Sequence, residues 1–254
     1  MSEDIRLPPA YRLVARDEVD STNDEARRLA EAGAEDGTLV WAKTQRKGRG
    51  RRGRDWASPP GNLYFSLVLR PECPPFEAAQ LSFVAALGLA GALGSLCPPL
   101  SEVAFKWPND VLLNDHKTAG ILLESSTTEP VRLDWLVLGM GVNVTSAPED
   151  TEFPATSLRA EGCDRVSAAA VLEAFARHFL VWVNRWLDDG FGPVREAWLR
   201  EARGVGEAVT VRIAGETFTG TFVDLDADGA LIVETVPGDR RVVTAGDLYF
   251  GGES

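Results

Sequence analysis

The clearest periodic pattern in the chain lies at residues 62–70, where large apolar side chains occupy every second position. This period of two predicts a strand with one apolar side, formed by Leu63, Phe65, Leu67 and Leu69. Shorter apolar runs predict further strands at 38–43, 103–107, 111–114, 120–124 and 135–144. Asp115 and His116 separate two of these runs, as the tip of a hairpin would.

Helical patterns surround these strands. The segment 20–23 precedes the first, in which Thr22 and Glu25 form a capping box and Gly33 ends the helix. Further helices are expected at about 76–96, at 167–187 and at 193–202, and the long one begins at the cap Ser167 and ends at Gly190. Strands and helices interleaved in this way predict an α+β domain with a mixed central sheet and flanking helices, over residues 1–203.

The pattern changes after Gly204. Short alternating runs follow one another at intervals of about ten residues, separated by turn sequences such as Asp228-Gly229 and Pro237-Gly238-Asp239. Such spacing is typical of a small all-β, barrel-like unit. We therefore expect a second domain at residues 204–254.

One segment, residues 78–100, carries no charge and is long enough to cross a membrane. It is rich in alanine and glycine, and it ends in Cys97-Pro98-Pro99. Its larger apolar residues Leu81, Val84 and Leu87 are spaced as on one helical face. These features favour a buried amphipathic helix over a membrane span.

The distribution of charge limits the classes of partner. The 254 residues are 44% hydrophobic, which suits one sizeable core, and their formal net charge is −12. Residues 46–54 alone carry +6, so the remainder carries −18. An acidic body of this kind repels nucleic acid and anionic membranes at long range. A basic segment embedded in it indicates a local, small anionic ligand.

The three cysteines, Cys73, Cys97 and Cys163, lie far apart in the sequence. Their spacing does not suggest a metal site, and their odd number argues against a disulfide framework. The first ten residues contain acidic groups and no apolar signal core. Together these features favour a reduced, cytoplasmic location.

The basic loop, residues 45–56, is the strongest candidate for chemistry. Its glycines let the backbone approach an anion, and its arginines offer fixed charge and two-pronged hydrogen bonds. Trp56 adds a flat face for a planar base. A mobile, solvated basic loop or an RNA-binding segment of the arginine–glycine type explains the composition about equally well. Because its cations repel one another, we expect the loop to be mobile without a ligand.

Two further motifs are ambiguous when taken singly. Residues 106–110 (Lys-Trp-Pro-Asn-Asp) and 117–122 place Lys106 and Lys117 at opposite ends of a hairpin-like unit. A hairpin with exposed lysines would have the same sequence. Residues 139–143 end an apolar strand with two glycines and an asparagine, which is also typical of a flexible strand end.

Taken together, the motifs occur in the order and spacing of the biotin–protein ligases, and the chain resembles this family from about Val19 to its C-terminus. The residues that carry the resemblance are 20–23, the basic loop, Ser58-Pro59, 61–64, 106–110, 117–122 and 139–143. The resemblance implies a class II synthetase-like catalytic domain over 1–203 and an SH3-like β-barrel domain over 204–254. It also implies a two-step reaction, in which biotin and ATP form biotinyl-5′-AMP and pyrophosphate, and the adenylate then acylates a lysine of a biotin carboxyl carrier protein.

The resemblance also implies roles for individual residues. Catalysis would rest on Lys117 and Arg51, and Asp110 would contribute to a Mg²⁺ site. Biotin would be bound by Ser21, Thr22, Asn23, Gln45, Gly48, Arg49, Gly50, Arg51, Lys117 and Gly120. ATP and the adenylate would be bound by Arg52, Arg54, Trp56, Lys106, Asn109, Lys117, Gly139 and Asn143.

The chemistry of the reaction agrees with these residue types. Joining two anions demands positioning and cationic stabilisation, and it requires no nucleophilic side chain. His116 is expected to be an exposed turn residue and His178 a structural one. The alternatives are an acyl ligase that uses lipoate or octanoate, and a nucleic-acid-binding module built on the basic loop.

The resemblance extends to partners. The family often forms homodimers, so a homodimer is possible here. Some members carry an N-terminal DNA-binding domain, but only about 18 residues precede Val19, which is too few for a three-helix DNA reader. We therefore expect neither DNA binding nor membrane binding.

Overall fold

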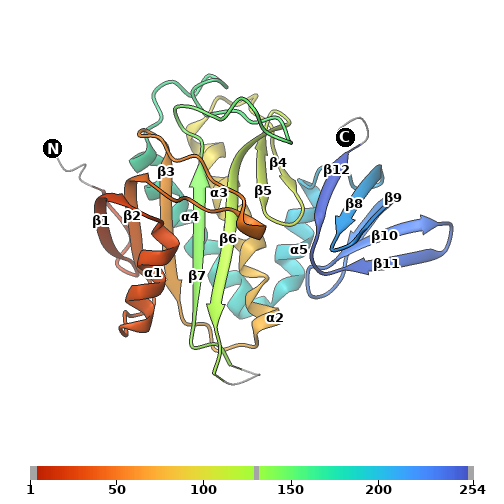
Figure 1. Cartoon of the computed structure of the whole chain (residues 1–254), viewed down its shortest axis with the longest axis horizontal. Coiled ribbons are helices and arrows are strands. Elements are labelled where there is room, and N and C mark those ends of the chain that lie inside the picture. The colour runs from red at the N-terminus through yellow and green to blue at the C-terminus, as the bar shows by residue number, and fades with distance from the viewer. Residues whose placement is uncertain (1–4, 129–131, 251–254) are drawn as a thin grey trace.

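A seven-stranded mixed sheet forms the centre of the molecule in the computed structural model, which describes residues 5–128 and 132–250 (Figure 1). Across the sheet the strands are β1 (Arg12–Val19), β2 (Thr38–Gln45), β3 (Leu63–Leu69), β7 (Trp135–Val142), β6 (His116–Ser126), β5 (Asp110–Leu113) and β4 (Val103–Lys106). Only β1 and β2 run parallel, and every other neighbouring pair is antiparallel. The predicted mixed central sheet is therefore confirmed.

Two helices cover one face of this sheet. They are α3 (Leu81–Leu96) and α4 (Ala168–Asp189), which lie behind the strands in Figure 1. Gly88 brings them close, because a Cβ added there would lie 3.1 Å from the Cα atom of Phe179. Alternate residues of the central strands, such as Phe65 and Leu138, join this core. The short α2 (Pro75–Ala78) precedes α3, and α5 (Phe191–Arg200) follows α4.

The opposite face of the sheet is only partly covered by a helix. Ala26 and Ala30 of α1 (Thr22–Glu31) pack against Val40, Val68 and Val137. Further along the same face, β6 and β7 carry glycine instead of residues with larger side chains. Gly120 of β6 and Gly141 of β7 lie opposite each other there. This part of the face is therefore open to a ligand, and Figure 1 shows the loop after β2 crossing in front of it.

The C-terminal unit is a five-stranded antiparallel sheet. Its strands are β8 (Ala208–Ile213), β9 (Glu216–Leu225), β10 (Leu231–Val236), β11 (Asp239–Val243) and β12 (Asp247–Phe250), in the order β11-β10-β9-β8-β12. The α+β class with a second, all-β unit is thus confirmed. No pair joins β11 to β12 within the residues described, so the expected closed barrel is not found. Trp107 ties this sheet to the larger unit, because its indole N–H donates to the carbonyl of Gly229 at 3.1 Å.

Three local predictions require correction. Strand β1 was not anticipated, because polar and apolar side chains do not alternate along it and most of them are exposed. Helix α1 has no capping box: Ser21 is the cap residue, and the Thr22 hydroxyl bonds to Gln45 instead. Helix α3 is not amphipathic, since every residue from Leu81 to Leu89 is buried.

The apolar segment Pro75–Leu96 is long and apolar enough to span a membrane by composition, but most of it is buried within the protein. Because α4 and the central sheet surround α3, this segment is the core helix of the larger unit. The preference for a buried helix is therefore confirmed, although residues 81–89 are buried on every side of the helix and not on one face alone.

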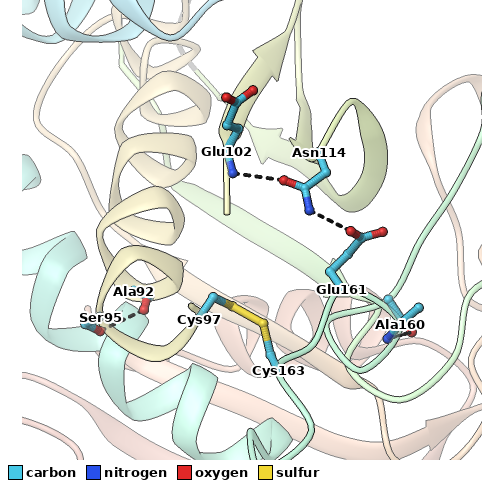
Figure 2. The surroundings of a disulfide bond; sticks show 9 residues. Ala92, Ser95, Cys97, Glu102, Asn114, Ala160, Glu161 and Cys163 are labelled. Atoms are coloured by element: carbon cyan, nitrogen blue, oxygen red, sulfur yellow. Dashed lines mark hydrogen bonds between the residues drawn. A yellow bond between two sulfur atoms is a disulfide. The ribbon is translucent and has the colours of Figure 1, made fainter. Parts of the chain in front are cut away.

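A disulfide joins Cys97, at the end of α3, to Cys163 in the segment after β7 (Figure 2). Their Cα atoms are 5.2 Å apart although 66 residues separate them in sequence. The argument against disulfides from the odd number of cysteines was therefore wrong for this pair. It failed because fold topology alone brings the two residues together. Cys73 remains a free thiol.

Arg70, directly after β3, anchors the far end of α1. Its guanidinium donates to the carbonyls of Ala30, Ala34 and Asp134 at 2.8–3.0 Å. These carbonyls lie at the C-terminal end of the helix and beside it, where intrahelical donors are lacking. Arg70 therefore holds α1 in position on the sheet.

We predict that Arg70→Ala lowers the free energy of unfolding by about 2 kcal/mol, because several bonds to a charged donor are lost. Urea unfolding followed by circular dichroism measures this change. Arg200→Ala is the matched control, since Arg200 is 72% exposed and pairs with its helical neighbour Glu196; it should cost less than about 0.5 kcal/mol. Equal stabilities of the two variants would contradict the anchoring role.

Candidate functional site

A cleft of about 240 Å³ opens on the glycine-lined part of the sheet. The basic loop, the segment 148–155 and the first residues of β12 form its walls. Of the eighteen site residues predicted from the sequence, all but Gly48 and Arg52 line this cleft. Those that do are Ser21, Thr22, Asn23, Gln45, Arg49, Gly50, Arg51, Arg54, Trp56, Lys106, Asn109, Asp110, Lys117, Gly120, Gly139 and Asn143. The fold thus gathers residues from distant parts of the sequence.

One end of the cleft is polar without being charged, and we call Ser21, Thr22, Asn23 and Gln45 the polar end. The N–H and the hydroxyl of Thr22 contact the Oε1 atom of Gln45 at 2.8 and 3.0 Å. The Gln45 amide N–H₂ donates to Ser58 at 3.0 Å. The first turn of α1 and the end of β2 are therefore held together by side-chain hydrogen bonds.

The other end is cationic, and we call Arg51, Arg54, Lys106 and Lys117 the cationic end. Lys117 Nζ lies 2.7 Å from a carboxylate oxygen of Asp110, in the facing strand. Burial lowers the pKa of the Arg51 guanidinium. A partly desolvated guanidinium interacts strongly with an anion because little water screens it. This end of the cleft is thus suited to negative charge.

Lys106 enters the cationic end through an aromatic enclosure. Its Nζ atom lies 3.7 Å from the ring centre of Phe153 and 5.3 Å from that of Tyr249. The side chain is buried, and the aromatic faces favour its charged form. Strand β4 therefore presents a fixed ammonium group rather than a freely moving surface lysine.

Trp56 lies on the glycine floor between the two ends. A Cβ added at Gly141 would lie 2.5 Å from Cε2 of the indole, and one at Gly120 would lie 3.0 Å from Cζ3. The ring can approach the sheet so closely only because both positions lack side chains. The indole N–H is buried and has no hydrogen-bond partner within the residues described.

Carboxylates oppose the charge of the basic loop. Arg49 forms two bonds to Asp24, at 2.6 and 2.8 Å, and this contact lowers the pKa of the Asp24 carboxyl. Arg52 and Arg54 both donate to Asp247 of β12, at 2.8 and 2.6 Å. The expected mutual repulsion of the loop cations is thereby offset. The mobility expected from that repulsion remains a prediction.

Asn109, Asn143 and Gly139 are also engaged by other parts of the protein. The Asn109 amide donates to the carbonyl of Ile121 and accepts a hydrogen bond from Arg51. The Asn143 amide donates to the carbonyl of Thr156 at 3.1 Å. Gly139, expected on the nucleotide side, lies directly beneath Asn23 of the polar end. These residues shape the cleft as well as lining it.

Sequence reasoning missed the walls contributed by later segments. Asp247 and Tyr249 come from β12, and Glu152 and Phe153 come from the segment after β7. Glu152 accepts hydrogen bonds from Tyr249 and Arg212, which lowers the pKa of its carboxyl. These residues stand in no motif, so only the packing of the C-terminal sheet against the larger unit reveals them.

The two histidines lie outside this chemistry. His116 is exposed at the start of β6. The hairpin tip before it is formed by Asn114 and Asp115, whose φ values are positive, one residue earlier than expected. His178 lies within α4 and packs against Gly91 of α3. The exposure of His116 is confirmed, but it belongs to β6 and pairs with Leu113 instead of lying in the turn. The structural position of His178 is confirmed.

Comparison with known proteins identifies relatives for nearly the whole chain. Residues 55–200 match the sequence model of the biotin/lipoate A/B protein ligase family, and residues 204–251 match that of the biotin protein ligase C terminal domain. Biotin–[acetyl-CoA-carboxylase] ligase from Paracoccus denitrificans is 44% identical over 92% of this chain and 98% of its own length. The bifunctional ligase/repressor BirA of Bacillus subtilis is 34% identical over 94% of this chain and 74% of its own length.

A solved structure is similar in fold as well. Biotin protein ligase from Aquifex aeolicus in complex with biotin and ATP superimposes with a TM-score of 0.78 and 30% sequence identity. The match covers 94% of this chain and 97% of that protein. The likeness thus includes both the central sheet and the C-terminal sheet.

We predict that Asp247→Ala loosens the basic loop, because Arg52 and Arg54 then lose a shared acceptor. Since both arginines are partly exposed, the effect should be modest: tryptic cleavage within residues 46–54 should become about fivefold faster. Limited proteolysis with mass spectrometry measures this rate. Asp239→Ala, at an exposed position of β11, should leave the rate unchanged. Identical cleavage of the Asp247→Ala variant and the wild type would show that the contacts of Asp247 with Arg52 and Arg54 do not restrain the loop.

Proposed function

The chain belongs to the biotin protein ligase family, and we propose from that premise how its cleft performs the reaction. The enzyme is an ATP-dependent biotin–protein ligase. It activates biotin with ATP to biotinyl-5′-AMP, releasing pyrophosphate, and transfers biotin to a lysine of the biotin carboxyl carrier protein of a carboxylase. What remains to be proposed is the role of each part of the cleft.

The observation that carries the proposal is the contrast between the two ends of one cleft. Biotin has a neutral head group with N–H donors and a carbonyl acceptor, and a carboxylate at the end of its chain. The polar end offers hydroxyl and amide groups to the head, and the cationic end offers charge to the carboxylate and the phosphates. Biotin would therefore span the cleft and meet ATP at the cationic end.

The same contrast favours biotin over lipoate, the other substrate in the family description. A dithiolane ring has no strong hydrogen-bonding groups, so binding it in the polar end would leave hydroxyl and amide groups desolvated without partners. Thr22, Asn23 and Gln45 are all at least partly buried. Their burial would disfavour an apolar head group.

In the proposed first step, the biotin carboxylate attacks the α-phosphorus of ATP, and pyrophosphate leaves. Lys117 and Arg51 lie at the cationic end, where they would offset the charge of the two reacting anions. Asp110 would orient Lys117 through the ion pair between them. In the second step, the amine of the carrier lysine attacks the acyl carbon and AMP leaves.

We assign the remaining residues to the two substrates. Biotin would contact the polar end, Gly48, Arg49, Gly50 and Gly120. The nucleotide would contact Arg52, Arg54, Trp56, Lys106, Asn109, Gly139 and Asn143, with Trp56 close to the adenine. The basic loop would then cover both ligands. Because Gly139 lies beneath Asn23, we expect its role for the nucleotide to be indirect.

Magnesium enters the proposal as part of the nucleotide substrate. Within residues 5–128 and 132–250, no group of three or more histidine, cysteine or acidic side chains is arranged to hold a metal ion. Nucleotide-bound Mg²⁺ commonly needs only one or two carboxylates besides the phosphates. Asp110 is our candidate for such a ligand. Binding of Mg²⁺ by its carboxylate would compete with the ion pair that it forms with Lys117.

Several broader assignments are also proposals. We divide the chain into a class II synthetase-like domain at 1–203 and an SH3-like unit at 204–254, with β11 and β12 as open edges of the latter. The acidic body disfavours duplex DNA as a partner. A cytoplasmic location fits the need for ATP. A homodimer remains possible for a family that often dimerises.

We predict that Lys117→Ala reduces kcat for biotin-dependent exchange of labelled pyrophosphate into ATP by about 100-fold or more, because a partly buried cation that would stabilise the reacting anions is removed. His116→Ala alters the exposed neighbour and should retain activity close to that of the wild type. Pyrophosphate exchange that proceeds equally well without biotin would contradict the proposed function. Full activity of Lys117→Ala would contradict only the role assigned to Lys117 in stabilising the reacting anions.

A further inference from the structure

A chain of hydrogen bonds runs behind the polar end and involves two residues that do not line the cleft. These are Ser66 of β3, which is fully buried, and Glu124 of β6. Ser66 Oγ lies 2.5 Å from Asn23 Oδ1 and 2.8 Å from the Thr22 hydroxyl. Glu124 accepts a hydrogen bond from the Asn23 amide nitrogen at 2.6 Å. Asn23 is therefore held at both ends of its amide.

The sheet provides a seat for this amide. Gly139 lies between Ser66 on β3 and Leu122 on β6. A Cβ added at Gly139 would lie 2.8 Å from Cγ of Asn23, so the amide rests directly on the bare backbone of β7. The position of Asn23 is thus fixed from below by packing and from both sides by hydrogen bonds.

The charges also fix which way the amide points. A carboxylate only accepts hydrogen bonds, so the nitrogen of Asn23 must face Glu124 and its oxygen must face Ser66. Ser66 therefore donates its hydroxyl proton to Asn23 Oδ1. The Glu124 carboxylate therefore sets which atom of the Asn23 amide donates and which accepts.

Glu124 also reaches the basic loop. Its second carboxylate oxygen lies 3.4 Å from Arg49, whose main partner is Asp24. One side chain thus contacts both the polar end and the loop that covers it. A residue that fixes the orientation of ligand-contacting side chains in this way stabilises the geometry of a binding site without touching the ligand itself.

We propose that Glu124 is a positioning residue for biotin, acting through Asn23, with Ser66 as its counterpart on β3. The proposal rests on the function proposed above. With the amide fixed, Asn23 keeps one N–H and one oxygen lone pair for the head group. Without Glu124 the Asn23 amide can rotate by half a turn, which exchanges the positions of its oxygen and its N–H₂ group facing the biotin head group. Loss of Glu124 should therefore weaken biotin binding and leave ATP binding intact.

The test compares Glu124→Ala, Glu124→Gln, Asn23→Ala and the double variant Asn23→Ala/Glu124→Ala in the biotin-dependent pyrophosphate exchange assay. Glu124→Ala should raise KM for biotin about tenfold, the change expected for one misplaced polar contact, while KM for ATP stays within about twofold. Glu124→Gln keeps an acceptor for Asn23 and should restore much of the loss. Ser125→Ala, the exposed neighbour on β6, is the matched control.

The double variant separates positioning from direct contact. If Glu124 acts through Asn23, Glu124→Ala should have little further effect on KM for biotin once Asn23 is alanine. Additive effects, or an unchanged KM for biotin in Glu124→Ala, would overturn the proposal. A wild-type enzyme without biotin-dependent exchange would instead overturn the proposed function. Urea unfolding of each variant distinguishes a local change from lost stability.

Discussion

The cleft exists because three positions on one face of the central sheet carry no side chain. Gly120, Gly139 and Gly141 lie on the adjacent strands β6 and β7, where a strand would normally project side chains to meet a covering helix. Helix α1 covers the neighbouring part of the face, and its first turn reaches the edge of the bare backbone. Asn23 and Trp56 then lie against that backbone at distances that any larger residue would prevent. The exposed backbone of β6 and β7 thus determines the positions of Asn23 and Trp56 in the cleft.

Electrostatic pairing completes the site from distant parts of the chain. The basic loop carries its charge into an acidic protein, and it contacts carboxylates on α1 and on β12. The C-terminal sheet is therefore a wall of the site as well as an appended unit. Asp247 pairs with Arg52 and Arg54, so if these arginines bind phosphates as proposed, the loop and the sheet would have to rearrange together.

Much of this architecture could be predicted from the sequence, since apolar periodicity identified β2, β3, β7 and α4, and ordered motifs located the cleft. Other features depend on tertiary structure. The edge strand β1 has no apolar pattern, and Asp247 belongs to no motif. Cys97 and Cys163 meet only because the segment after β7 folds back to the end of α3. Thr22 matched a helix cap by spacing, but its hydroxyl is used by Gln45. The assigned ligand roles remain predictions.

The disulfide also divides the chain into parts of different topology. Residues 97–163 form a covalently closed ring that contains Lys106, Lys117 and the strands β4 to β7. A single backbone cut inside this ring would leave the two pieces attached. The basic loop lies outside it, and a cut there would release a fragment that carries α1 and the polar residues 21–23. After such a cut, Lys106 and Lys117 would stay within the covalently closed ring, whereas residues 21–23 would be retained only by hydrogen bonds and packing.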